Sequence, residues 1–591
     1  MLRLFLVFPI AVVVLASASF VFGGCCAAWQ WWLAIVLAVA SGFWRRTARE
    51  GVCTGLIFLL WMAIAWVGCG LAVAPNWFDE SVYHIPAVRM LADGWNPLFV
   101  STPEELLSLT GFAQTDFRVD HVLFMPKIVW VFSAVAYFFT NDLLNPLVPI
   151  LWFLVPPVMM RIWRSMEGSS LVWKALAVPL VYCLLFNSAY VIDVVVQLAA
   201  IGLLLSFEEV LSGRRIDVLS LVAYSFWMMG AKPPGLLHGG LFWAIFLAFA
   251  FFRKVSWRPL AQVAAAVSIL LALACATPYL TSIRHYGHPF YPRYTLDEKR
   301  FPVRNITEDF LTGQNEDAAS MGFAGRYFYS FVSPSLARTW YRWWLDKPGF
   351  QPYSENNRHY PNDGDGTEPI RFGMRVAFWA SVALLLLVGR KSFRPIAVMV
   401  VLGTAAMPLP LLGYTRYIPW WLLPLLFAYI DLTCGGGRWR RTLACLVLLG
   451  TFAIPPYTLP KKVGYTLKLV DERQRLLEIL DGTLPPIRPC WGHSLAQLKM
   501  MRQEFPALAT AELLPYSASL AVGLRAEDVE LPGKLFVFDD MNKMRRMASR
   551  VPPDVLGCVK YVLRSGFVTL PKAVGTRVAS LFDGRKDANG E

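Results

Sequence analysis

Two adjacent carboxylates, Asp79 and Glu80, follow an apolar run that ends at Ala74. Acidic side chains where a chain leaves a bilayer are unfavourable unless they face a polar cavity, so this pair marks a candidate active site. Tyr83 and His84 follow at helical spacing and extend the same polar face. A carboxylate held in such a cleft can act as a general base toward a hydroxyl group. The alternative is a pair of interfacial acids that water solvates and that take part in no chemistry.

Three further ionisable residues lie at the ends of other apolar runs. Asp193 lies at a turn between two such runs, where it is either a second catalytic acid or simply the cap of the following helix. Lys232 is followed by two prolines and a glycine and is well placed to meet an anion, although a snorkelling lysine would look the same. Arg416, with Tyr417 beside it, also lies at a span end, and a phosphate group would be a suitable partner for this cation.

The segment from Arg284 to Pro292 is expected to form a rigid turn, and it contains His285 and His288. The two histidines could bind a metal ion, but their spacing matches no strong metal motif. We therefore predict that Arg284 and His288 contact substrate. No cofactor is required by this interpretation, and the presence of a divalent cation stays open.

The composition is that of an integral membrane protein. The chain has 591 residues, of which 56% are hydrophobic and only 16% are charged. Many apolar runs reach the roughly 20 residues that a helix needs to cross the hydrocarbon core of a bilayer. The net charge of +14 does not indicate nucleic acid binding, because Arg and Lys cluster in short loops between the apolar runs. That distribution is typical of cytoplasmic loops in membrane proteins.

Placing every basic cluster in the cytoplasm predicts an all-α polytopic membrane protein with about thirteen transmembrane helices and a cytoplasmic N-terminus. The clusters are Arg45-Arg46, Arg161/Arg164, Arg214-Arg215, Arg253-Lys254, Arg390-Lys391 and Arg438/Arg440/Arg441. The predicted spans are residues 4–23, 27–43, 51–74, 145–160, 172–189, 192–208, 216–232, 235–252, 259–280, 374–389, 395–412, 417–433 and 441–457. The first span could instead be a signal peptide, because Ala16-Ser17-Ala18 resembles a cleavage site. Asp79, Asp193, Lys232 and Arg416 then all lie on the outer side.

One apolar segment does not fit a full crossing. Residues 122–139 are apolar enough to cross, but a crossing there would move Arg161 and Arg164 to the outer side. The segment is also short and contains Lys127 near its start. We therefore predict an interfacial or re-entrant helix within one outer loop that covers residues 75–144, and Lys127 is a candidate substrate contact.

Two other outer regions are large. Residues 281–373 form a second outer loop rich in Tyr, Trp and Arg, and residues 458–591 form a polar tail after the membrane domain of residues 1–457. We expect the tail to be a small α+β extracytoplasmic domain. Its predicted elements are strands at Lys534–Phe538, Val559–Leu563 and Arg577–Leu581 and helices at 470–480 and 494–504. Cys490 and Cys558 fall in this tail and could form a disulfide bond in an oxidising compartment.

The outer face thus combines carboxylates, cations outside the usual charge bias and many aromatic rings. Such a set suits transfer from a phosphate-linked donor, because a base can deprotonate the acceptor while cations stabilise the leaving phosphate. The sequence has no P-loop on the cytoplasmic side. A donor available on the outer face without a nucleotide would be linked to a lipid, which the membrane can deliver laterally.

The chain resembles the GT-C fold glycosyltransferases, which include protein O-mannosyltransferases and lipid A aminoarabinose transferases, over residues 51–433. The resemblance rests on the order and shared outer placement of short segments, namely Asp79-Glu80, Met125-Pro126-Lys127, Asp193, Lys232 to Gly235, Gly287 to Pro292 and Arg416 to Pro419. It implies inverting transfer of a sugar from a polyprenyl-phosphate donor to a lipid, glycan or protein acceptor. Asp79 would resemble the catalytic base of the family, and Lys232 and Arg416 would resemble its phosphate contacts.

Two alternatives stay open. A transporter or flippase for a lipid-linked glycan would gather polar groups at broken helices near the membrane midplane, whereas the groups here lie at outer span ends. An envelope assembly protein without catalysis would use the tail to bind a partner. The expected location is a bacterial inner membrane with the C-terminus in the periplasm, and the expected partners are membrane lipids rather than nucleic acid.

Overall fold

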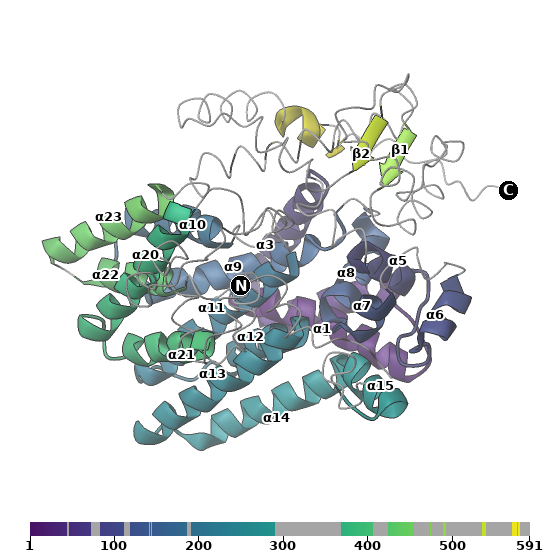
Figure 1. Cartoon of the computed structure of the whole chain (residues 1–591), viewed down its shortest axis with the longest axis horizontal. Coiled ribbons are helices and arrows are strands. Elements are labelled where there is room, and N and C mark those ends of the chain that lie inside the picture. Colours follow the sequence, from purple (N-terminus) through teal and green to yellow (C-terminus); the bar gives the residue numbers. More distant parts are fainter. Residues whose placement is uncertain are drawn as a thin grey trace, which may run out of the picture. The chain divides into compact units, whose positions relative to one another are not determined.

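The computed structural model describes residues 1–43, 47–72, 83–110, 119–140, 142, 145–185, 191–289, 368–405, 423–435 and 437–453. In the tail it describes residues 463, 467, 470, 473, 488–491, 535–538, 570–575 and 577–578. The described chain is mostly helical (Figure 1). Four of the predicted site residues lie outside the described residues, namely Asp79, Glu80, Arg416 and Tyr417.

Helices account for nearly all described elements before the tail. They are α1 (Leu2–Val21), α2 (Ala28–Phe43), α3 (Ala48–Cys69), α5 (Ile85–Ala92), α6 (Pro103–Thr110), α7 (Val119–Phe124), α8 (Ile128–Thr140), α9 (Pro149–Ser165), α10 (Leu171–Leu185), α11 (Val191–Leu211), α12 (Val218–Ala231), α13 (Pro233–Phe252), α14 (Trp257–Ala274), α15 (Ala276–Tyr286), α20 (Glu368–Leu387), α21 (Phe393–Ala405), α22 (Leu423–Cys434) and α23 (Arg438–Ala453). Each range predicted as a membrane span overlaps one of these helices.

Five of the described helices are long and apolar enough to cross a membrane, namely α1, α3, α11, α13 and α14. Other apolar helices are shorter, and they include α2, α8, α10, α12, α21 and α22. The helices therefore support a membrane protein built mainly from α-helices. The total of thirteen spans and the orientation of the termini stay predictions.

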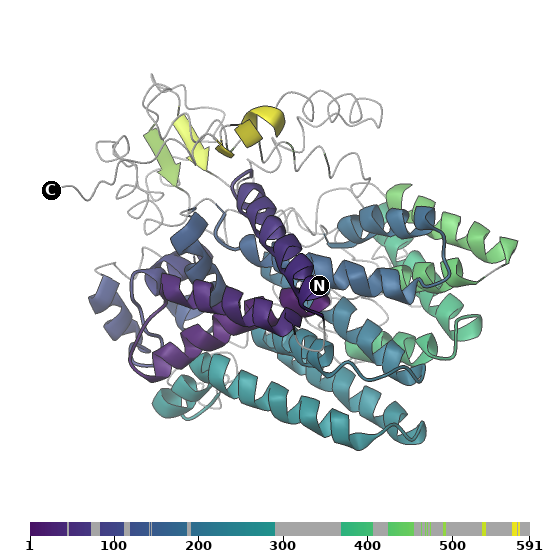
Figure 2. The ribbon, with the colours of Figure 1, turned by 180° about the vertical axis from the view of Figure 1, so that it is seen from behind.

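Two compact units make up the chain. Unit 1 contains residues 3–153 and 460–591, and unit 2 contains residues 154–459. The boundary between residues 153 and 154 falls inside α9, within the predicted membrane domain. The tail belongs to the same unit as the first helices, which Figure 2 shows from behind in purple.

Helix α8 forms much of the core of unit 1. Its residues from Ile128 to Tyr137 are all buried. The ring of Phe132 packs against Phe8 of α1 and Trp31 of α2, with centroids 6.2 and 5.9 Å apart. The 13 residues of α8 extend for about 20 Å, less than the roughly 30 Å of a hydrocarbon core. The choice between a re-entrant and an interfacial helix stays a prediction.

Helix α5 runs parallel to α8. His84, just before α5, contacts Trp130, and Arg89 further along α5 contacts Tyr137 further along α8. The end of α8 meets α3, where Trp66 donates its indole N–H to the carbonyl of the penultimate residue of α8 at 3.1 Å. The start of α5 and the exit of α3 therefore lie near opposite ends of α8.

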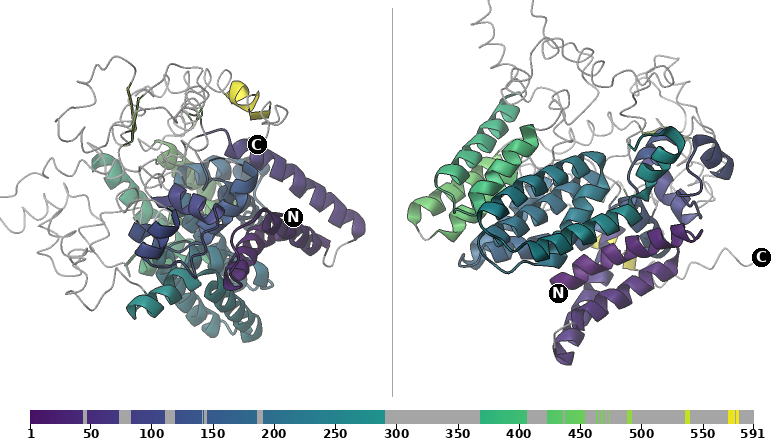
Figure 3. Two further views of the ribbon diagram at one scale, coloured as in Figure 1. Left: turned by 90° about the vertical axis from the view of Figure 1, so that its right-hand side faces the viewer. Right: turned by 90° about the horizontal axis from the view of Figure 1, so that it is seen from below.

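In unit 2, helix α12 packs against α11, α13 and α14 (Figures 1 and 3). Helix α11 is buried along its whole length, as expected of a run that is apolar on every side. Only 33% of the apolar stretch of α13 and 22% of that of α14 are buried. This exposure suits helices that face lipid, whose tails are as apolar as the side chains.

Basic clusters of unit 2 meet at one end of its helices, where acidic residues neutralise them. Arg161 of α9 binds Glu209 at the end of α11 and Asp217 just before α12, the latter at 2.6 Å. The Arg161 side chain is 0% exposed. An arginine buried in this way requires acidic partners, because an uncompensated charge in the interior is strongly unfavourable.

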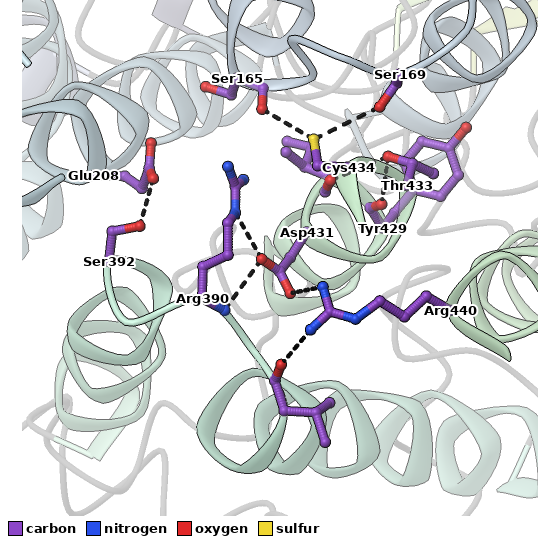
Figure 4. Close-up of polar contacts among 12 residues, drawn as sticks. Ser165, Ser169, Glu208, Arg390, Ser392, Tyr429, Asp431, Thr433, Cys434 and Arg440 are labelled. Carbon is purple, nitrogen blue, oxygen red and sulfur yellow. Dashed lines mark hydrogen bonds and ion pairs between the residues drawn. The ribbon is translucent and has the colours of Figure 1, made fainter. Parts of the chain in front are cut away.

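The neighbouring loops carry further polar contacts (Figure 4). Asp431 lies between Arg390, at 2.8 Å, and Arg440, at 4.0 Å. Ser392 donates its hydroxyl to Glu208 at 2.6 Å. Arg253 donates to the carbonyls of Leu211 and Lys391, and Arg214 pairs with Glu167 at 3.8 Å. We call this end of unit 2 the basic end, and it comprises Arg161, Arg214, Arg253, Arg390 and Arg440. These contacts agree with the prediction that the basic clusters share one side of the membrane.

The described part of the tail contains one parallel strand pair. β1 (Arg488–Trp491) pairs with β2 (Leu535–Phe538), with Arg488 opposite Leu535 and Trp491 opposite Phe538. The predicted strand at Lys534–Phe538 is thus confirmed, whereas β1 was not predicted. The strand predicted at Arg577–Leu581 is wrong at its start, because Arg577 and Val578 are helical. The strand predicted at Val559–Leu563 lies outside the described residues, as does Cys558, the proposed partner of Cys490.

Candidate functional site

Lys232 separates α12 from α13 because two prolines follow it. A residue before proline is biased away from the α conformation, and Lys232 is extended, with φ −156° and ψ 145°. Pro233 and Pro234 suit the first turn of α13, where a backbone N–H is not needed. A Cβ atom at Gly235 would lie 2.0 Å from the carbonyl oxygen of Met228, so glycine allows α13 to start this close to α12.

Lys232 forms an ion pair with Asp193, which lies in the first turn of α11. Its ammonium nitrogen is 2.5 Å from Oδ1 of Asp193. The carboxylate is 1% exposed and the lysine side chain 14% exposed. Because Glu209 lies at the other end of α11, this pair is at the end of unit 2 opposite the basic end. The structure therefore brings together two of the predicted site residues.

The second carboxylate oxygen of Asp193 has a different environment. Oδ2 is buried and has no hydrogen-bond partner among the residues that the structure describes. A carboxylate near a helix N-terminus is stabilised by the helix dipole, and the start of α11 supplies that field to Asp193. Because the Lys232 ammonium already contacts Asp193, an incoming anion that binds Lys232 has to share or exchange this contact.

Two further buried polar residues, one on α11 and one on α13, were not predicted as site residues from the sequence. Gln197, one turn after Asp193, donates its side-chain amide to the carbonyl of Leu184 at 3.2 Å. His238 lies in the second turn of α13 and is 0% exposed. Both could have been identified in the sequence as polar residues inside apolar runs, because such residues commonly mark functional positions in membrane proteins.

A second group of predicted site residues lies in unit 1, around the start of α8. Nδ1 of His84 accepts a hydrogen bond from the indole N–H of Trp130 at 2.8 Å. A neutral imidazole that accepts at Nδ1 carries its proton on Nε2, which is then a donor. The ring of Tyr83 lies beside His84, with centroids 4.1 Å apart, and both residues are buried.

Lys127 belongs to this group but is bound to the protein itself. Its ammonium donates to the carbonyls of Leu123 and Met125, at 2.7 and 2.8 Å. It also lies 5.8 and 5.6 Å from the ring centres of Trp95 and Trp130, within range of cation–π attraction. These contacts stabilise a side chain that is 2% exposed, and they give Lys127 a structural role at the end of α7.

The remaining predicted residues are less constrained. Arg284 is exposed near the end of α15, and His288 is partly exposed just after it. In the part of the chain that the structure describes, no three His, Cys, Asp or Glu side chains are grouped as metal ligands would be. The structure gives no geometry for Asp79 and Glu80, so the predicted acidic centre is not part of the described site.

No family model, no curated protein and no solved structure matches this chain.

Proposed function

We propose that the protein is an integral membrane glycosyltransferase that moves a sugar from a polyprenyl-phosphate donor to an extracytoplasmic acceptor. The observation that best supports this proposal is the ion pair between Asp193 and Lys232, at the end of unit 2 away from the basic end. The bias of Arg and Lys toward cytoplasmic loops would place that end outside the cytoplasm. A partly buried lysine there provides the cation that a lipid phosphate needs.

In the proposed reaction, the acceptor hydroxyl oxygen attacks the anomeric carbon of the sugar. The carboxylate of Asp79 takes the hydroxyl proton as the new bond forms, in the manner of a general base. The bond between the anomeric carbon and the phosphate oxygen breaks, and the lipid phosphate leaves with the electron pair. Lys232 and Arg416 stabilise the negative charge on that phosphate. Glu80, Tyr83 and His84 orient the sugar or the acceptor.

The ion pair supports a role for Asp193 other than that of a second catalytic acid. Its carboxylate holds the Lys232 ammonium in place before the donor arrives. An arriving phosphate then competes for the same ammonium, and the lysine turns from one anion to the other without leaving the site. Asp193 is a positioning residue in this scheme, and it also compensates the partly buried cation before the donor binds.

A lipid flippase is the competing function. Transporters place their substrate sites near the membrane midplane, commonly at broken helices. The ionisable residues of α11 are Asp193, Glu208 and Glu209, which lie near its two ends. Its middle is apolar, and the helix is continuous through the 21 residues from Val191 to Leu211. This distribution favours a site at a helix end and therefore the transferase.

The substitution Lys232→Ala is expected to weaken donor binding by about tenfold or more, since a hydrogen bond to a charged group contributes roughly 1.5–3 kcal/mol. The measurement is the Kd of purified protein in nanodiscs for a polyprenyl-phosphate sugar, together with transfer to an envelope extract. Lys391→Ala is the matched control, because Lys391 is exposed at the basic end. If Lys232→Ala bound the donor as tightly as the wild type does, Lys232 would not be a phosphate contact. Lipid movement without sugar transfer by the wild type would favour the flippase.

A further inference from the structure

Two arginines of the tail reach back to the first helices of unit 1. Arg473 forms an ion pair with Asp142 at 3.0 Å, and the two side chains are 5% and 3% exposed. The same guanidinium nitrogen donates to the carbonyl of Ala72, just past the end of α3, at 3.3 Å. Arg577 donates to the carbonyl of Thr140, the last residue of α8, at 3.3 Å.

Arg577 occupies a place where a helix leaves a carbonyl group unpaired. The last four carbonyls of a helix have no intrahelical partner, and they form the negative end of the helix dipole. A guanidinium group placed there satisfies a carbonyl and compensates that charge, as Arg577 does at the end of α8. Arg473 instead binds the carbonyl of Ala72, which lies beyond the end of α3.

The contact of Arg577 depends on a glycine. Its guanidinium carbon lies 4.0 Å from the centre of the Trp66 ring, close enough for a strong cation–π interaction. A Cβ atom at Gly70 would lie 2.3 Å from Nε of Arg577 and 2.7 Å from its guanidinium carbon. Gly70 has ordinary backbone angles, φ −87° and ψ 7°, so its lack of a side chain serves the arginine rather than the backbone.

Asp142 strengthens this docking. Its carboxylate is buried just after α8, and the charge of Arg473 compensates it. Removing one partner of a buried ion pair is strongly unfavourable. The tail therefore stabilises the arrangement at the ends of α3 and α8.

We infer that Arg473 and Arg577 are positioning residues that dock the tail on the exits of α3 and α8, and that sugar transfer depends on this docking. Ala72, whose carbonyl accepts from Arg473, precedes Asp79 by only seven residues in the sequence, and an effect on transfer is expected for this reason. The dependence of transfer on docking rests on the proposed function. The docking of the tail itself does not depend on that function.

The test compares Gly70→Ala with Gly55→Ala, a control inside α3, the helix that ends just before Gly70. The added Cβ atom at Gly55 would meet nothing closer than 3.7 Å. In Gly70→Ala the methyl group displaces Arg577, and we expect limited proteolysis to cleave the tail about tenfold faster, because cleavage follows the population of the released form. Transfer by Gly70→Ala should fall in kcat, while the Kd for the polyprenyl-phosphate sugar stays as in the wild type. Both proteins should elute as single species in size-exclusion chromatography.

A charge exchange provides the second arm. Arg473→Asp should release the tail, and combining it with Asp142→Arg should restore both protection from protease and kcat. A tail that stays protected in Gly70→Ala and in Arg473→Asp would overturn the inference, as would a released tail with unchanged kcat. Absence of transfer by the wild type with every donor would refute the proposed function and the positioning role, whereas proteolysis would still report on the docking.

Discussion

Substituting Asp79 by Asn is expected to abolish glycan transfer while the protein still inserts and folds. The amide is nearly the same size as the carboxylate but cannot accept the acceptor proton. General base catalysis contributes roughly 10²–10⁴-fold to a rate, so the residual turnover should fall by at least that factor. The measurement is the rate of sugar transfer from a polyprenyl-phosphate donor by purified variants at equal protein concentration.

Asp93→Asn is the control for Asp79→Asn. Asp93 lies in the same predicted outer loop, is 53% exposed and pairs only with Arg89 across one helical turn among the contacts described. Such exposed pairs contribute about 0–1 kcal/mol, so this variant should keep wild-type turnover. If Asp79→Asn also turned over normally, the assignment of Asp79 as the base would be wrong.

The second large effect concerns stability. Arg161→Met is expected to lower the free energy of unfolding by about 3–5 kcal/mol, because it leaves the buried carboxylate of Glu209 without its cation. Asp217, which is 33% exposed, loses the same partner but can be solvated. Unfolding of the purified protein in mixed micelles, titrated with a denaturing detergent and followed by tryptophan fluorescence, gives the comparison with the wild type.

Arg164→Met is the matched control, since Arg164 lies on the same helix and is exposed. It should change the unfolding free energy by less than about 0.5 kcal/mol, as most surface substitutions do. Adding Glu209→Gln to Arg161→Met should recover part of the loss, because the remaining buried group is then neutral. Equal stability of the Arg161 and Arg164 variants would show that the basic end contributes nothing to the fold.

Charge distribution made part of this architecture predictable. Clusters of Arg and Lys in short loops predict that those loops share one side, and the contacts of Arg390 and Arg440 with Asp431 do bring two of the loops together. The break between α12 and α13 could also be predicted, because Pro233 and Pro234 bias the residue before them away from helical backbone angles. Both signals are local, one in composition and the other in backbone geometry.

Pairings between distant residues were not predictable. Asp193 and Lys232 were each singled out, but a direct ion pair depends on how α11 packs against α12 and α13, which no local pattern encodes. Glu208 and Glu209 drew no attention although they bind Ser392 and Arg161. Arg577 was predicted to lie in a strand but is helical. Strand propensity depends strongly on packing, and the packing of the tail overrides it here.

The burial of Arg161 has a consequence for how the protein is made. Arg161 is synthesised 48 residues before Glu209 and 56 before Asp217. Helix α9 also contains two prolines, Pro156 and Pro157, and leaves the ribosome with an arginine whose acidic partners do not yet exist. Arg161 lies at the basic end, so its side chain can stay in water while these partners are missing. Its burial, and with it the final packing of α9, therefore becomes possible only after α11 and α12 have been synthesised.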